Sequence, residues 1–276
     1  PLYSSAASDV YKRQAGGCLS MTWTARPHRR GGRQLALHRS RFRRERAGIW
    51  DLRWLPVCSS TEISLAEWLR DSPDLMRPRA VLARRQRRGV GQRGRHWQSP
   101  SGGVWLSAAM PWSGQSVPAA GLFGLALALE LAQRLERHGV PVRIKWPNDL
   151  LVEGRKLAGV LPRLVHRGTQ LRLVRCGIGL NVSNAVPTGA IALREWVPPA
   201  EASVDVWAAE LLLALECSLN LVAGSSPWLQ RVEDRLWSDQ ILSSDKGPPW
   251  SIEGLSSRGG LQLRRGQQRT EWIRWP

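Results

Sequence analysis

The sequence predicts a mixed α+β protein. Two long segments, residues 119–138 and 204–223, repeat apolar side chains every three to four positions, which is the period of an amphipathic helix. Several shorter apolar runs have the length of strands, and residues 236–276 alternate short polar and apolar runs as a small β unit does. With 276 residues, 42% of them hydrophobic, the chain can bury a sizeable core in one large domain or two smaller ones.

Composition limits the class of protein. The formal charge of +18 would ordinarily indicate nucleic acid or another acidic partner. However, only four of the forty basic residues are lysines, and fifteen tryptophans accompany two tyrosines, so the charge reflects a global composition bias. The longest apolar run, residues 121–131, is shorter than the roughly 20 residues that span a bilayer. Residues 2–15 lack the apolar core of a signal peptide, so we expect a cytoplasmic protein without membrane attachment.

The cysteines indicate neither a metal site nor a disulfide framework. Cys18, Cys58, Cys176 and Cys217 are scattered along the chain and form no Cys-x-x-Cys pair. We expect four free thiols.

Residues 1–47 are rich in arginine, glycine and serine and have little apolar periodicity. Such a segment is typical of a solvated, disordered basic arm. A winged helix-turn-helix would need two or three helices with clear three-to-four spacing, and the segment has none, so this alternative is disfavoured.

Regular patterns begin after this arm. Residues 52–57 predict a first strand, the hydroxyl residues 59–61 an N-cap, and residues 62–69 a short helix. Residues 80–83 then predict a buried strand. The short helix would carry Ile63, Ala66 and Leu69 on one side.

Residues 84–97 predict a flexible loop, because glycines alternate with cationic and polar side chains. Glycine permits positive φ and close approach, so such a loop can close around a phosphate. The spacing Gly-x-Gly-x-x-Gly is a weak signal on its own, and a strand-like run over residues 103–110 follows it instead of a helix. This order argues against a dinucleotide-binding fold.

The middle of the chain continues with a helix and several strands. Gly139 stands where the helix over residues 119–138 would have its C-terminal cap. Residues 161–166 and 171–182 predict two strands. The glycines at 177 and 179 mark either the close approach of a ligand or a β-bulge, and the sequence leaves both open.

Residues 143–160 hold the densest group of polar side chains. Lys145, Asn148, Asp149 and Lys156 stand around the rigid pair Trp146-Pro147, between apolar runs that predict strands. Two of the chain's four lysines lie here, and a compact ammonium group isn't freely replaced by arginine. This favours a chemical site, although an ordinary hairpin with a Glu-Gly turn at residues 153–154 explains the same pattern.

In this order, these stretches resemble the biotin protein ligases over about residues 50–265. The resemblance rests on Ser60-Thr61, on Gln86 with residues 89–97, on Ser99-Pro100, on residues 145–149 and 154–159, and on residues 177–181. It implies an α+β fold, with a mainly antiparallel sheet and packed helices over residues 48–232. A small C-terminal SH3-like β-barrel would follow over residues 233–276. The family's barrel is longer than the residues up to Pro276 supply, as in a truncated domain.

The resemblance also implies an activity. Members of the family adenylate biotin with ATP and Mg²⁺, then transfer it to a lysine of the biotin carboxyl carrier protein of acetyl-CoA carboxylase. The chain resembles the ligase-only class, so we expect no specific DNA binding and a monomer or weak homodimer. Lipoate ligation is the alternative that shares the fold and the chemistry, and a basic nucleic-acid-binding protein is the alternative from another class.

Site residues follow from the matching motifs. The resemblance places biotin against Ser60, Thr61, Gln86, Gly89, Trp97, Gly103, Lys156 and Gly159. It places ATP and the adenylate against Gln92, Arg93, Arg95, Lys145, Trp146, Asn148, Lys156 and Asn181. The catalytic candidates are Lys156, Asp149 and Arg95.

The chemistry assigns roles to these candidates. Lys156, assisted by Arg95 or Arg93, would separate the biotin carboxylate from the α-phosphate, since both groups are anionic. Asp149 would place magnesium or accept the proton of the incoming amine, and Asn148 would orient the adenylate.

Two residues in the glycine loop depart from the family pattern. Val90 and Gln92 stand where the family usually has arginine. We expect weaker retention of the adenylate phosphate as a result.

Overall fold

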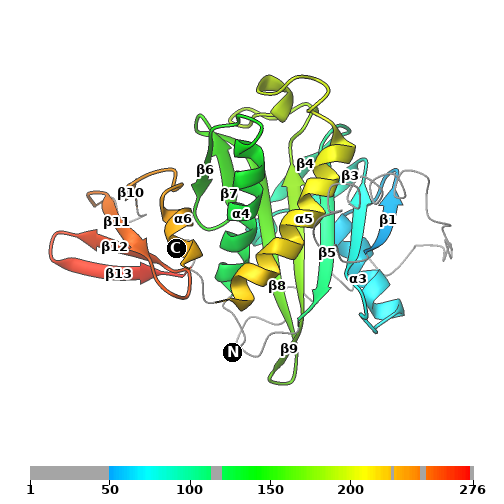
Figure 1. Cartoon of the computed structure of the whole chain (residues 1–276), viewed down its shortest axis with the longest axis horizontal. Coiled ribbons are helices and arrows are strands. Elements are labelled where there is room, and N and C mark those ends of the chain that lie inside the picture. The colour runs from blue at the N-terminus through cyan, green and yellow to red at the C-terminus, as the bar shows by residue number, and fades with distance from the viewer. Residues whose placement is uncertain (1–49, 113–119, 225–226, 243–246, 274–276) are drawn as a thin grey trace.

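The computed structural model describes residues 50–112, 120–224, 227–242 and 247–273. Its main element is a seven-stranded sheet with the strand order β1-β2-β5-β9-β8-β7-β6 (Figure 1). Every neighbouring pair is antiparallel except β1 with β2. The strands are β1 (Asp51–Leu55), β2 (Arg79–Ala83), β5 (Val104–Pro111), β6 (Val142–Lys145), β7 (Asp149–Val152), β8 (Arg155–Arg167) and β9 (Gln170–Leu180). The predicted α+β class with a mainly antiparallel sheet is confirmed.

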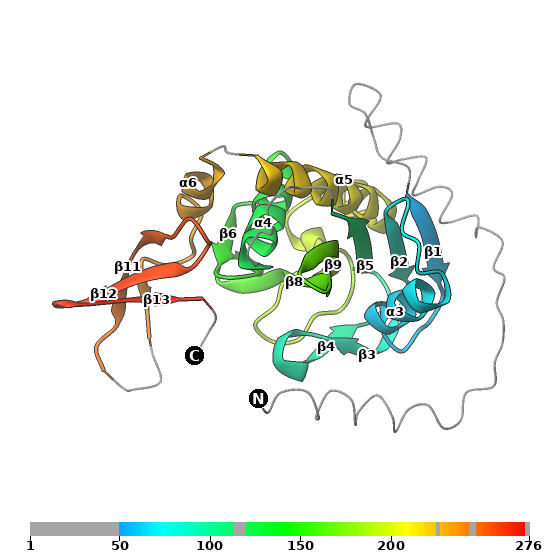
Figure 2. The same cartoon turned by 90° about the horizontal axis from the view of Figure 1, so that it is seen from below.

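Two long helices cover one face of this sheet, as Figure 2 shows. They are α4 (Ala120–Glu136) and α5 (Val204–Ala223), which pack against each other. Both helices agree with the periodicity of the sequence. Gly139 has a φ of +74° just after α4, where its N–H bonds to the carbonyl of Glu136, so the predicted cap is confirmed.

Helix α5 is long and apolar enough to cross a membrane by length and composition. Residues 207–215 are nevertheless all buried within the fold. This pattern is typical of a core helix, which passes the same test of length and composition.

The other face of the sheet carries α3 (Thr61–Asp71) and the two-stranded hairpin of β3 (Gln86–Val90) and β4 (His96–Ser99) (Figure 2). The predicted short helix is present, and it buries Leu65 and Trp68 while Ile63, Ala66 and Leu69 are partly buried. Leu65 and Trp68 pack on Val81, Ala109 and Leu173 of the sheet, which gives the helix a second, smaller apolar cluster.

The predicted flexible loop is also corrected, because residues 86–99 mostly form this hairpin. Gly89 pairs with Trp97, and Val90 pairs with His96. A Cβ atom on Gly89 would lie 2.4 Å from the carbonyl oxygen of Trp97. The glycine therefore serves close strand approach rather than flexibility.

The polar stretch at residues 143–160 contains the hairpin with a Glu-Gly turn that the sequence allowed. Strands β6 and β7 pair with each other, and β7 pairs with β8 around the turn at Glu153 and Gly154, whose φ values are 48° and 74°. The Trp146–Pro147 peptide bond is cis.

A separate four-stranded antiparallel sheet follows the short helix α6 (Trp228–Glu233). It has the order β10-β11-β12-β13, with β10 (Gln240–Ile241), β11 (Trp250–Leu255), β12 (Leu261–Arg265) and β13 (Gln268–Trp272). The indole Nε1 of Trp146 donates to the carbonyl of Gly259 at 3.0 Å. The predicted small C-terminal β unit is present, and this bond joins it to the β6–β7 turn.

The arginine-rich arm, residues 1–47, and Cys18 lie outside the described residues. The other three cysteines, Cys58, Cys176 and Cys217, are free thiols as predicted.

Candidate active site

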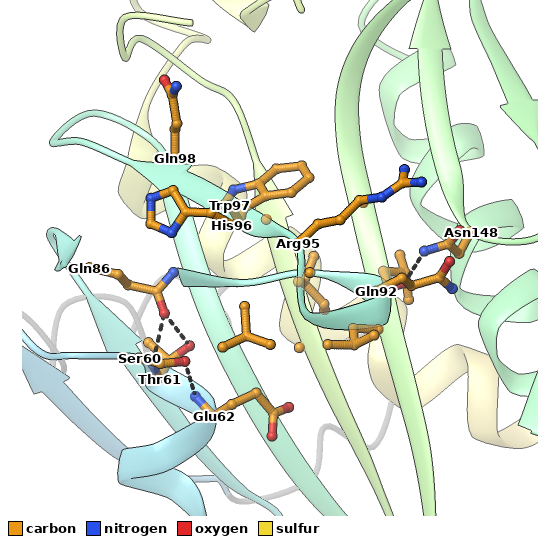
Figure 3. Close-up of a pocket in the computed structure, with 18 of the residues that line it drawn as sticks. Ser60, Thr61, Glu62, Gln86, Gln92, Arg95, His96, Trp97, Gln98 and Asn148 are labelled. Carbon is orange, nitrogen blue, oxygen red and sulfur yellow. Dashed lines mark hydrogen bonds between the residues drawn. The ribbon is translucent and has the colours of Figure 1, made fainter. Parts of the chain in front are cut away.

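A pocket of about 330 Å³ opens on the sheet face that carries α3 and the β3–β4 hairpin. Strands β8 and β9 form its floor, the start of α3 closes one end, and the β3–β4 hairpin covers it (Figure 3). Eleven of the residues predicted for the site line it, and they are Ser60, Thr61, Gln86, Gln92, Arg95, Trp97, Asn148, Asp149, Lys156, Gly159 and Asn181.

Glycines make the floor flat. Gly159 of β8 and Gly179 of β9 are paired in register. A Cβ atom on Gly179 would lie 2.5 Å from the indole of Trp97, and one on Gly159 would lie 3.0 Å from the same ring. The glycines predicted to permit close approach therefore accept the Trp97 side chain, and residues 177–180 pair with β8 in continuous register without a bulge.

A chain of hydrogen bonds lies at the end of the pocket near α3. The Gln86 Oε1 atom accepts from the Thr61 backbone N–H at 2.7 Å and from the Thr61 hydroxyl at 3.1 Å. Since the Thr61 hydroxyl donates to Gln86, the Ser107 hydroxyl, 2.8 Å away, must donate to Thr61. The Gln86 Nε2 group donates in turn to Ser99 Oγ at 2.8 Å.

This chain leaves the end of the pocket neutral but able to form more hydrogen bonds. The Thr61 oxygen accepts one bond and retains an acceptor lone pair. The Ser60 oxygen accepts from the Glu62 backbone N–H at 3.3 Å, which leaves its own proton to donate. A ligand that offers both donors and acceptors fits this end.

Glu62 lies at the same end, next to Ser60 and Thr61 (Figure 3). Its Oε2 atom forms an ion pair with Arg175 of β9, and both side chains are largely buried. The Oε1 atom is buried and has no hydrogen-bond partner among the residues that the structure describes. Burial, with the negative charge of Glu62 nearby, raises the pKa of the Cys176 thiol well above its usual range.

The opposite end of the pocket is charged. The Lys156 ammonium lies 2.7 Å from the Asp149 carboxylate and 4.8 Å from the centre of the Trp97 ring. Asn148 donates through Nδ2 to the Val160 carbonyl at 2.6 Å, and Asn181 donates to the Lys156 carbonyl at 3.3 Å. Both amides are thus held by the backbone of β8, beside the lysine.

The hairpin turn supplies one cation, Arg95, to the rim. Gln92, the first residue of a short 3-10 turn (Gln92–Gly94), and Arg95, which follows the turn, both line the pocket, and the Arg95 N–H bonds to the Gln92 carbonyl. Arg93, at the centre of that turn with a φ of 56°, is exposed and does not line the pocket. Val90 also lines it, so both departures from the family pattern face the site.

Four further predicted residues lie outside this pocket. Gly89 packs within the hairpin, and Gly103 lines a different cavity beside Trp105 and Arg84. Lys145 is exposed at the end of β6. Trp146 is buried and bonds to the small C-terminal sheet, as described above.

The pocket also contains residues that the sequence did not single out. Glu62 was assigned only to a helix, and Ser107 only to a strand. The apolar side chain that β8 presents to the pocket is Leu161, and the loop residues Pro187 and Ala190 lie near Lys156. A polar serine within the apolar run of β5 was the one local signal for Ser107.

The arrangement can hold an elongated ligand with a neutral, hydrogen-bonding head, an apolar middle and an anionic tail. The head would lie near Thr61 and Gln86, and the tail near Lys156 and Arg95. Within the described ranges, no three His, Cys, Asp or Glu side chains gather as a ready-made metal site.

Comparison with known proteins agrees with this geometry. Residues 54–181 match the Biotin/lipoate A/B protein ligase family. The bifunctional ligase/repressor BirA of Escherichia coli (strain K12) is 33% identical over 231 residues, which cover 79% of this chain and 71% of that protein. The biotin--[acetyl-CoA-carboxylase] ligase of Paracoccus denitrificans is 38% identical over 137 residues, 49% of this chain and 57% of that protein.

A solved structure shares the fold. The biotin protein ligase from Aquifex aeolicus in complex with biotin and ATP superposes with a TM-score of 0.63 at 24% identity, covering 81% of this chain and 96% of that chain.

Proposed function

Because the chain belongs to the biotin protein ligase family, we propose that it joins biotin to a lysine of the biotin carboxyl carrier protein of acetyl-CoA carboxylase. The reaction consumes ATP, releases AMP and diphosphate, and passes through biotinyl-5′-AMP. One observation carries the proposal: a single pocket has the Thr61–Gln86 hydrogen-bond chain at one end and Lys156 at the other.

The neutral end suits the ureido ring of biotin. This ring has two N–H donors and one carbonyl acceptor, and Thr61, Ser60 and Gln86 offer complementary groups. Leu161 and the Trp97 ring give the aliphatic side chain of biotin an apolar surface. The biotin carboxylate then points toward Lys156.

Adenylation brings two anions together. An oxygen of the biotin carboxylate attacks the α-phosphorus of ATP, and the bond from that phosphorus to the bridging oxygen breaks to release diphosphate. Lys156 offsets the charge between the two groups, and Arg95 adds a second cation at the rim. The 2.7 Å contact with Asp149 orients the ammonium group before the ligands bind.

Transfer of biotin from the adenylate to the carrier lysine follows in the same pocket. The carrier lysine amine attacks the acyl carbonyl of the adenylate, the carbon–oxygen bond to phosphate breaks, and AMP leaves. Asp149, whose carboxylate lies 2.7 Å from the Lys156 ammonium, accepts the proton of the amine. Asn148 and Asn181, held by the β8 backbone, keep the adenylate in line.

Magnesium fits this site only as an ion that enters with the nucleotide. Asp149 is the carboxylate that would hold it, since magnesium commonly takes one or two protein carboxylates together with substrate phosphates. When bound, magnesium would neutralise part of the phosphate charge.

The proposal extends to the organisation of the protein. Residues 48–232 would form the catalytic unit and residues 233–276 a small β unit, in keeping with the two separate sheets. We further propose a cytoplasmic monomer or weak homodimer that binds no specific DNA. Any affinity of the full chain for DNA should then be independent of sequence and fall steeply with salt.

A transfer assay tests the function. The protein is incubated with radiolabelled biotin, ATP, magnesium and a biotin carboxyl carrier domain, and with a carrier whose acceptor lysine is replaced by arginine. We expect label on the first carrier only, with stoichiometric AMP. Absence of label, or preferential transfer of lipoate under the same conditions, would contradict the proposal.

A further inference from the structure

The β3–β4 hairpin and the residues just before it carry a concentration of positive charge. Six arginines stand from residue 84 to residue 95, and the sequence has no aspartate or glutamate from residue 75 to residue 129. The hairpin is the outermost layer on its face of the sheet (Figure 2). Four of the arginines are exposed and form no ion pair with any residue that the structure describes, and these four make up the hairpin surface: Arg85, Arg87, Arg88 and Arg95.

The arginine-rich composition of the chain does not by itself explain this surface. In other parts of the fold arginines meet carboxylates, as Arg235 does with Glu136. The carboxylates that line the pocket beneath the hairpin, Glu62 and Asp149, are already paired with other cations. Repulsion among the like charges of the hairpin surface costs free energy, and an anionic partner would relieve it.

The hairpin surface lies at the rim of the pocket. Arg87 and Arg88 stand in β3 between Gln86 and Val90, which both line the pocket, and Arg95 lines it directly. A lysine side chain has a short aliphatic stem, so a lysine that enters the pocket brings the protein surface around it close to this rim. The macromolecule that receives biotin is therefore the partner whose surface comes closest to these arginines.

We propose that the hairpin surface is the docking site for the carrier domain, and that the carrier presents an acidic surface around its acceptor lysine. This inference rests on the proposed function, and it adds the place of the contact and the sign of the charge on each side. Opposite charges across a contact speed the encounter and fix its orientation more than they raise affinity. The hairpin thus selects carriers by charge before any chemistry takes place.

The test reverses the charge of two arginines at the centre of this surface. In Arg87→Glu/Arg88→Glu the backbone pairing of β3 is kept, because both side chains are exposed and both backbone N–H groups bond to carbonyls of the segment before α3. The matched control, Arg137→Glu/Arg231→Glu, changes the net charge equally at exposed positions after α4 and in α6. Steady-state biotinylation of a carrier domain is measured for all three proteins, as is single-turnover diphosphate release without carrier.

We expect kcat/KM for the carrier to fall about tenfold in the hairpin variant at low salt, through a higher KM, because the attraction between the two surfaces is lost. The value of kcat at saturating carrier, and diphosphate release without carrier, should equal those of the wild type. The difference should disappear near about 1 M salt, where exposed charges are screened. The control should match the wild type throughout.

Three results would overturn the proposal. They are a wild-type kcat/KM in the hairpin variant, an equal loss in the control, and a loss of diphosphate release as large as the loss of transfer. If the hairpin variant lost affinity for DNA and kept its kinetics with the carrier, the surface would belong to a nucleic-acid partner and the proposal would be wrong.

A charge-swapped carrier tests the acidic partner directly. Replacing the carboxylates nearest its acceptor lysine by lysine should make the carrier about tenfold poorer for the wild type. The same carrier should be used better by Arg87→Glu/Arg88→Glu than by the wild type, since the signs of both surfaces are then exchanged. Absence of this reversal would show that the two surfaces do not meet.

The wild type alone keeps the proposal testable if the variants do not fold. At saturating ATP and biotin, its kcat/KM for the carrier should fall steeply with salt while diphosphate release changes little. A kcat/KM that does not depend on salt would overturn the proposal. Failure of the wild type to label any carrier would instead contradict the proposed function.

Discussion

The two faces of the seven-stranded sheet serve different purposes. On the face toward α4 and α5, successive strands present Ala158, Val160, Cys176, Ile178 and Leu180, all of which belong to one large apolar cluster. The intervening positions of the same strands, on the other face, are Gly159, Arg175, Gly177 and Gly179. Because side chains alternate along a strand, one stretch of sequence provides both the core and the floor of the site.

The difference shows how the protein separates stability from binding. The helix-covered face gains its energy from apolar area, which needs no particular ligand. The pocket face lacks side chains at three floor positions. Two of its buried polar atoms, Glu62 Oε1 and Trp97 Nε1, have no hydrogen-bond partner within the described part of the chain. Changes on the first face should therefore affect folding, and changes on the second should affect ligands.

The largest effect is expected on the helix-covered face. Leu129 of α4 is fully buried, so Leu129→Ala should lower the free energy of unfolding by about 2–5 kcal/mol through lost apolar contacts and a residual cavity. Denaturant titration measures this change. Biotin affinity at a temperature where the variant remains folded should equal that of the wild type, and a clear loss would break the proposed separation of the two faces.

Substitution of Lys156, on the pocket face, should lower the reaction rate and leave the stability of the fold nearly unchanged. Lys156→Ala should slow biotin-dependent diphosphate release by a factor that corresponds to about 3 kcal/mol, since one charge-stabilising group at the reacting centre is removed. Stability should change little because the side chain is 35% exposed.

Arg155, the residue before Lys156, provides the control for this substitution. Arg155→Ala removes a cation that pairs with Glu195 and Glu153 outside the pocket, and it should react at the wild-type rate. Near-normal diphosphate release by Lys156→Ala would show that Lys156 does not have this role.

Two buried serines, one beside the pocket and one in α5, allow the effect of a single hydrogen bond to be compared between the two faces of the sheet. Ser107→Ala removes the donor to Thr61 and should weaken biotin binding by about fivefold, the effect of one hydrogen bond of about 1 kcal/mol. Ser218→Ala, in α5, removes a bond of the same length to the Leu215 carbonyl and should affect stability alone. Isothermal titration with biotin distinguishes the two, and equal affinities in both variants would exclude a role for Ser107 in positioning Thr61.

The smallest effect concerns the rim. A charged donor binds phosphate more strongly than an amide does, so Gln92→Arg should slow the escape of biotinyl-adenylate by about two- to fivefold. Filtration after a single turnover measures the escape, and Gln170→Arg, at the distant start of β9, is the control. An unchanged escape rate would mean that other groups, such as Arg95, already hold the phosphate.

Local patterns in the sequence predicted much of the fold. The two long helices agree with their predicted ranges to within two residues, because their apolar periodicity is long and uninterrupted. The hairpin β3–β4 was missed because glycine and arginine are poor strand formers, and this hairpin depends on pairing across the turn.

The sequence likewise predicted some residues of the site and missed others. Motifs with unusual residue types, such as the two lysines and the glycine runs, drew attention to Lys156, Gly159 and the β9 glycines. Glu62 and Ser107 carry no such signal, since glutamate in a first helical turn and serine in a strand are common. Their importance arises only when α3 is placed over β5 and β9.

The sequence alone determined the class of fold, the order of its elements and the family, since all three depend on periodicity and on the order of local motifs. Only the tertiary structure decided which residues share the pocket. It brought Gln86 to Thr61 and Trp97 to Gly179, and it placed Glu62 between Arg175 and Gly177. Such contacts join residues up to 113 positions apart in the chain. They depend on how strands pair and on which face each helix covers, and neither is encoded in a local stretch.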